Sequence, residues 1–167
     1  MNKERKKLTI NLYDEDVFNE YGVDGDEILQ EELTTTISNL ANTEKISTPL
    51  ELTFIKPENN KIDNDKFVKA FSNSYNAEIS RKKHECTRCI ITGIILLLVG
   101  VAMLAFDVFV MEPLNYFFYE FFNVFAWVFC WGGIEILTIE LIQLIMEKNK
   151  AKRVLNSKIV LVDKNKK

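Results

Sequence analysis

The sequence has no lysine, arginine or histidine anywhere between Ile90 and Met146. This stretch holds two long apolar runs, separated by the short polar segment Glu112–Asn115. About 20 apolar residues in a helix span the hydrocarbon core of a bilayer, and a soluble core helix seldom stays apolar on every side over that length. We therefore expect a hairpin of two transmembrane helices, over about residues 90–111 and 117–142.

The signatures of common enzyme classes are also absent. There is no phosphate-binding glycine loop, no serine-hydrolase elbow and no zinc-protease motif, and His84 is the single histidine of the chain. We expect a protein that is not an enzyme, with no catalytic residues and no cofactor. A membrane-tethered enzyme that uses an unrecognised pair of carboxylates is our last alternative.

Basic residues flank the hairpin at both ends, in the segments 81–88 and 148–153, and none lies in its connecting loop. The positive-inside rule then predicts that both termini are cytoplasmic. The segment Met1–Lys7 is polar and no apolar run follows it, so we expect no cleaved signal peptide. High lysine, asparagine and isoleucine content with four arginines suggests an AT-rich genome, and we expect a bacterial inner membrane.

The net charge of −3 conceals two parts of opposite sign. Residues 1–89 carry 13 basic and 17 acidic side chains, whereas residues 147–167 carry 8 basic and 2 acidic ones. The basic tail suits the surface of an anionic bilayer, although the positive-inside rule alone accounts for it. The head shows no basic stripe interleaved with aromatic residues, so we expect no nucleic-acid partner.

The head should have mixed helix and strand structure. The sequence before the hairpin predicts four elements: a strand at 8–12, a helix opened by a capping box at Asp24 and Glu27 that ends near 42, a strand at 50–54, and a helix from Asn64 that can run unbroken into the first span. A short apolar run predicts a last strand at about 158–163. Because strands apolar on both faces are usually central, we expect this strand to lie between the other two.

These elements define the fold class that we expect. It is an α+β membrane protein with a small cytosolic head, residues 1–89, that resembles a split βαβ arrangement. A C-terminal strand in the basic cytosolic tail, residues 147–167, completes the head. The two-helix transmembrane hairpin, residues 90–146, is inserted before this last strand.

Two cysteines, Cys86 and Cys89, form a C-x-x-C pair just before the first span. Residues three apart share one face of a helix, so this is a candidate thiol site. A structural zinc needs four ligands and the chain offers no second pair, so we expect no metal. Acylated cysteines or two reduced thiols without a role are the other interpretations.

The spans contain acidic residues, which usually face protein or water inside a membrane. We take Asp107 and Glu135 as candidate polar sites, either as carboxylates along a cation path in an oligomer or as interfacial groups. We interpret Glu120 and Glu140 as interfacial groups that reach towards water.

Small residues recur at seven-residue spacing in both spans, with Gly93 and Gly100 in the first and Ala126 and Gly133 in the second. Such a column stays on one helix face and lets membrane helices approach closely. The columns either close the hairpin or join two subunits.

The segment from Asp14 to Glu32 holds nine acidic residues and no basic one. Its spacing does not match a calcium-binding EF-hand loop, so we interpret it as a solvated face that could bind a cytosolic protein partner.

Together, these patterns predict a protein that acts by association. The head binds a partner or signal, and the hairpin, in the lipid bilayer, joins a second copy or another membrane protein. A homo-oligomeric ion channel or a membrane-disrupting effector, gated by the head, is the alternative.

Overall fold

The computed structural model describes residues 5–12, 17–19, 27–57, 62–106, 108–109 and 116–164. The chain divides into two compact units. Unit 1 combines Met1–Arg81 with Lys148–Lys167, and unit 2 is Lys82–Glu147. The C-terminal tail therefore belongs to the same unit as the N-terminal part of the chain.

Unit 1 is built on a three-stranded parallel sheet of β1 (Lys6–Asn11), β2 (Leu50–Lys56) and β3 (Lys158–Asp163), in the order β1-β2-β3. The prediction that the C-terminal strand lies between the other two is therefore wrong, because β2 is central and β3 is an edge strand. Each crossover lays the new strand beside the previous one, the commonest connection in such sheets. The four apolar residues of β3 remain half-exposed, whereas Leu50, Leu52 and Phe54 of β2 are buried.

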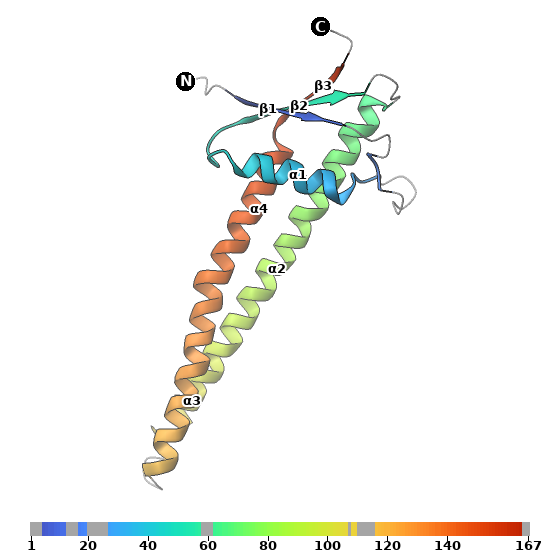
Figure 1. The fold of residues 1–167 in the computed structure, drawn as a ribbon. Coiled ribbons are helices and arrows are strands. Elements are labelled where there is room, and N and C mark those ends of the chain that lie inside the picture. The colour runs from blue at the N-terminus through green and yellow to red at the C-terminus, as the bar shows by residue number, and fades with distance from the viewer. Residues whose placement is uncertain are drawn as a thin grey trace. The chain divides into compact units, whose positions relative to one another are not determined.

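The core of unit 1 lies on one side of this sheet. Figure 1 shows α1 (Glu31–Asn42), the first turns of α2 (Asn64–Phe106) and the last turns of α4 (Leu141–Leu155) together on that side. Right-handed crossovers in the order β1-β2-β3 send every connection over the same face. Aromatic residues fill the centre, with ring centroids of Phe54 and Phe67 4.9 Å apart and those of Phe71 and Tyr75 4.8 Å apart.

Helix α1 begins later than the sequence predicts. Its first residue is Glu31, Gln30 precedes it without a side-chain cap, and the predicted capping residue Asp24 lies outside the described residues. Leu29 instead forms an isolated antiparallel bridge with Phe18. Its backbone N–H donates to Ser74 Oγ at 2.8 Å, so the backbone groups that a longer helix would use already have other partners.

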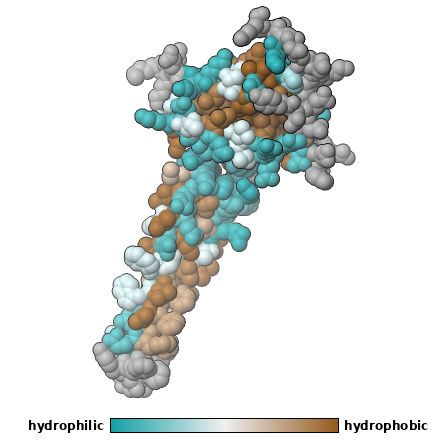
Figure 2. Space-filling view, in the orientation of Figure 1, coloured by the Kyte–Doolittle hydropathy of each residue, from teal (hydrophilic) through white to brown (hydrophobic). Residues whose placement is uncertain are grey.

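Unit 2 contains the apolar helices. Helix α2 runs without a break from Asn64 to Phe106, as predicted, and the second apolar segment comprises α3 (Tyr116–Glu135), the π-helical segment η2 (Ile136–Glu140) and α4. Both are long and apolar enough to cross a membrane. Only 11% of the most apolar window of each is buried within the described chain, whereas the core helix of a soluble protein is mostly buried. Figure 2 shows apolar side chains exposed along them.

Candidate functional site

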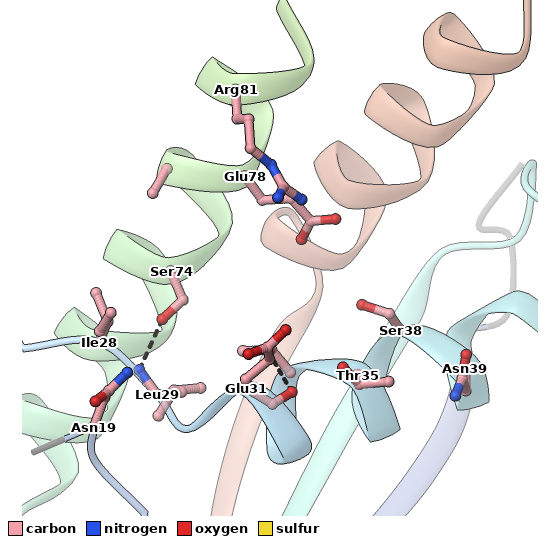
Figure 3. A pocket seen from close by; sticks show the side chains of 12 residues that line it. Asn19, Ile28, Leu29, Glu31, Thr35, Ser38, Asn39, Ser74, Glu78 and Arg81 are labelled. Atoms are coloured by element: carbon pink, nitrogen blue, oxygen red, sulfur yellow. Dashed lines mark hydrogen bonds between the residues drawn. The ribbon is translucent and has the colours of Figure 1, made fainter. Parts of the chain in front are cut away.

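A cavity of about 470 Å³ lies between α1 and α2 in unit 1. Helix α1 lines it with a polar face on which residues recur three or four apart, a spacing that keeps them on one side of a helix. Helix α2 lines the opposite wall in the same way. The lining side chains that Figure 3 labels on these helices are Glu31, Thr35, Ser38 and Asn39 on α1 and Ser74, Glu78 and Arg81 on α2.

Hydrogen bonds to buried groups fix the two walls of this cavity. The hydroxyl of Tyr75 donates to the carbonyl of Thr34 at 3.2 Å and lies 3.2 Å from the hydroxyl of Ser38. Ser74 Oγ accepts from Leu29 N–H and donates to the carbonyl of Ala70 at 2.9 Å. Burial raises the pKa of Tyr75 to about 12, so this phenol stays protonated at neutral pH and acts as a fixed donor.

The side chains that line the cavity are mostly polar. Hydroxyl and amide groups dominate its walls, and the charged side chains are Glu31, Glu78 and Arg81. No histidine or cysteine lines it, so the described residues around it include none of the pairs that activate a nucleophile. The arrangement can hold a polar molecule that both donates and accepts hydrogen bonds.

The other face of the sheet is a second candidate surface. The register aligns Thr9, Thr53 and Val160 in one row and Asn11, Ile55 and Val162 in the next. Ile55, Val160 and Val162 are half-exposed, whereas Thr53 beside them on the central strand is buried, and no described helix packs on this face. We call these two rows the open face of the sheet.

The small residues of the hairpin lie together at the contact between its two helices. A Cβ atom built on Gly100 would lie 2.9 Å from the backbone nitrogen of Cys130 and 3.0 Å from the carbonyl oxygen of Ala126. A Cβ atom on Gly133 would lie 2.9 Å from the carbonyl oxygen of Gly93. The four residues that the sequence marked for packing thus lie at one seam within a single chain, where the backbones approach closely.

The described acidic residues of the two apolar runs are Glu120, Glu135 and Glu140, and all three are exposed. They form no ion pair or hydrogen bond with the rest of the described chain. Asp107 lies outside the described residues, so the structure does not place it beside Glu135. Most of the acidic stretch before α1 lies outside them too; within the described part, Glu27 pairs with Lys66 at 2.8 Å.

The two cysteines before the first span differ in their surroundings. Cys86 is buried and Cys89 is half-buried, and both are free thiols. Among the described residues, no group of three or more histidine, cysteine, aspartate or glutamate side chains could hold a metal ion. The structure therefore provides the two thiols with no further ligand from the part of the chain that it describes.

Sequence reasoning missed two features of unit 1. One is the α1–α2 cavity, although Thr34, Thr35 and Ser38 already form a hydroxyl-rich stripe opposite the apolar side of α1. The other is Arg153, whose guanidinium donates to the carbonyls of Ala41, Glu44 and Lys45 at the end of α1. Burial lowers the pKa of Arg153, and the carbonyls supply the polar partners that its charge needs.

Comparison of the chain with protein-family models, with curated proteins and with solved structures finds no match.

Proposed function

We propose that this chain is a two-span membrane protein that acts by association, with the hairpin in the bilayer and unit 1 binding a protein partner in the cytoplasm. The hairpin helices expose apolar side chains to their surroundings over a length that matches a bilayer. Basic residues on both flanks favour cytoplasmic termini. We place the protein in a bacterial inner membrane on the composition of the sequence.

The position of the charges along the hairpin supports this arrangement. Gly100 lies against Cys130 near the middle of both spans. Counted at 1.5 Å per residue from that level, Glu135 lies about 8 Å away, Glu120 about 15 Å and Glu140 about 15 Å. The hydrocarbon core extends roughly 15 Å to each side, so Glu120 and Glu140 fall near its two edges. Because the described carboxylates avoid the middle level, we propose association rather than ion conduction.

Glu135 supports association within the membrane. It lies inside the apolar region by this count and is exposed on the outer surface of the hairpin. A carboxylate there is costly unless it faces protein or water. The small residues of the two helices already pack against each other within the chain. A second copy or another membrane protein would shield Glu135. Crosslinking in native membranes tests this, and Glu135→Leu should weaken a contact that Glu120→Leu leaves intact.

The observation that carries the role of unit 1 is the open face of its sheet. All-parallel sheets are almost always covered on both faces, and here the described helices cover one. Ile55, Val160 and Val162 give the open face an apolar area along β2 and β3. A protein partner that packs on this face would complete the usual layered arrangement and bury these side chains.

A single charge on the open face tests this proposal. Val160→Glu should leave unit 1 folded, because Val160 lies half-exposed on an edge strand, and should abolish capture of the partner. Thr36→Glu is the matched control, since Thr36 is exposed on α1 and away from the open face. The measurement is crosslinking in the native host followed by mass spectrometry. Equal partner recovery with both variants would remove the open face from the proposal.

Signal binding in the α1–α2 cavity is a second candidate role, favoured by its volume and by its charged and hydroxyl side chains. Thr35→Trp would fill the cavity from an exposed position, whereas Thr36→Trp adds the same ring to the neighbouring residue, which does not line it. A small molecule that co-purifies with the wild type and with Thr36→Trp, and is lost from Thr35→Trp, would establish the role. Loss from both variants, or from neither, would argue against it.

A further inference from the structure

A second cavity, of about 280 Å³, lies within unit 2 between α2 and the helix formed by η2 and α4. Glu85 and Arg88 line it from α2, and Ile136 and Glu140 line it from the two ends of η2. Arg88 lies two residues before Ile90, where the first apolar span of the sequence begins. In the topology proposed above, the cavity therefore opens at the cytoplasmic edge of the hydrocarbon core.

The charges around this cavity are of both signs and are kept apart. Glu85 pairs with Lys82 at 3.2 Å. Arg88 and Glu140 line the same cavity, yet neither forms an ion pair or hydrogen bond with any other described residue. Both side chains are exposed and can reach a ligand. A guanidinium and a carboxylate that share a cavity without touching match a ligand that carries one negative and one positive group.

The π-helical segment places Glu140 in this position. A π-helical turn takes up one residue more than an α-helical turn. The seven-residue column of Ala126 and Gly133 would otherwise direct Glu140 into the seam of the hairpin. The extra residue displaces Glu140 from the seam, and it joins Ile136 at the wall of the cavity.

We propose that this cavity binds the headgroup of a phospholipid that carries both a phosphate and a primary ammonium group. Arg88 holds the phosphate through its guanidinium, a geometry suited to phosphate oxygens, and Glu140 accepts hydrogen bonds from the ammonium. The volume lies just below the range of roughly 300–1,000 Å³ typical of whole small-molecule pockets, so it suits a headgroup. The acyl chains would lie against the exposed apolar side chains of the hairpin.

This inference rests on the proposed membrane placement, and native mass spectrometry of the full chain in detergent tests it with three lipids of equal acyl chains. Phosphatidylethanolamine has the phosphate and the primary ammonium, phosphatidylcholine replaces the ammonium protons with methyl groups, and phosphatidylglycerol has no cation. The wild type should retain phosphatidylethanolamine about tenfold more tightly than either other lipid, the effect of one charge-assisted hydrogen bond. Equal retention of the three lipids would overturn the proposal.

Two variants separate the contributions of the residues. Arg88→Gln should weaken the binding of all three lipids, whereas Glu140→Gln should remove the preference for phosphatidylethanolamine and leave the binding of phosphatidylglycerol unchanged or stronger. Lys83→Gln is the control, because Lys83 is exposed on the same helix and does not line the cavity. If Lys83→Gln reduced retention as much as Arg88→Gln, general attraction to basic residues would explain the binding and the site would fall.

Soluble phosphoethanolamine distinguishes a lipid from a free ligand of the same chemistry. It should displace the lipid only at a large excess; displacement at equal concentration would assign the cavity to a soluble phosphoamine and overturn the lipid proposal. Membrane insertion is measured separately, by resistance of the chain to alkaline extraction. An inserted chain without lipid preference refutes the site alone, whereas a chain that is extracted refutes the placement on which the site rests.

Discussion

Gly100 provides the strongest test of the hairpin. A Cβ atom at this position would lie 2.5 Å from Cys130 Sγ, 2.9 Å from the backbone nitrogen of Cys130 and 3.0 Å from the carbonyl oxygen of Ala126. Ordinary contacts begin at 3.4 Å, so the facing backbone would have to recede by about 0.4–0.5 Å. A gap of that size forfeits roughly a quarter of each dispersion contact along the seam. We expect Gly100→Ala to favour opening of the hairpin by about 1–3 kcal/mol, the usual cost of overpacking.

The matched control is Gly132→Ala. A Cβ atom on Gly132 would meet only the end of the Leu96 side chain, at 4.0 Å. Alanine at an unhindered helical position is favoured over glycine by roughly 0.5–1 kcal/mol, so Gly132→Ala should leave the hairpin unchanged or more stable. The two substitutions are chemically identical and lie in the two helices of one hairpin, so opposite signs would trace the effect to the seam.

The thiol of Cys130 reports the opening. It lies at the seam and is 8% exposed, so in detergent solution a small apolar maleimide reaches it mainly when the helices separate. In a background in which serine replaces Cys86 and Cys89, Gly100→Ala should raise the rate of alkylation roughly 5- to 150-fold, since 1.4 kcal/mol is a factor of ten. Gly132→Ala should not raise it. Equal rates for the two variants would show that the close approach at Gly100 does not hold the hairpin together.

Three further predictions concern topology, sheet order and pH. A reporter fused after Lys167 should be cytosolic and one inserted at Leu114 external, as protease protection of membrane vesicles would show; an external C-terminus would end the two-span proposal. Leu52→Ala in the fully buried central strand should cost about 2–5 kcal/mol of unfolding free energy, and Leu161→Ala at the half-exposed edge strand should cost less, measured by chemical denaturation of the full chain in detergent; the reverse order would argue for a central β3. Burial raises the pKa of Tyr75 to about 12, above the roughly 10 of a free phenol. The protonated phenol therefore stabilises unit 1 fully below about pH 10, and this stabilisation, about 2–3 kcal/mol, is lost as the pH rises from 10 to 12; Tyr75→Phe should flatten that part of the melting-temperature profile, and an unchanged slope would refute the assignment.

The two apolar helices could be predicted from the sequence because length and apolar composition are properties of each segment by itself. A helix that faces lipid must be apolar around its surface and long enough to span, and both properties are visible in the residues themselves. The same reasoning gave the unbroken helix α2, since no glycine or proline interrupts the sequence between Asn64 and Thr92.

The order of the strands could not be predicted in this way, because it is a relation among three segments. The run from Ile159 to Val162 is apolar at every position, which is typical of central strands. It nevertheless lies at the edge, paired with β2, and its outward residues form part of the open face. The apolar run of β3 led to the wrong strand order, and the same run now suggests where a partner binds.

The position of Glu140 could not be predicted from the sequence either, because it depends on the geometry of a single helix turn. Its spacing from Ala126 and Gly133 predicts a place in the seam, because the count assumes an α-helix throughout. Segment η2 departs from that geometry. The sequence does not indicate this change, because apolar residues lie on every side of this helix and so show no periodicity that would shift. A carboxylate in the seam would have faced backbone at close range, which is costly without a polar partner. Displaced by the π-helical turn, it lies exposed beside the cavity that also contains Arg88, where a charged ligand can compensate its charge.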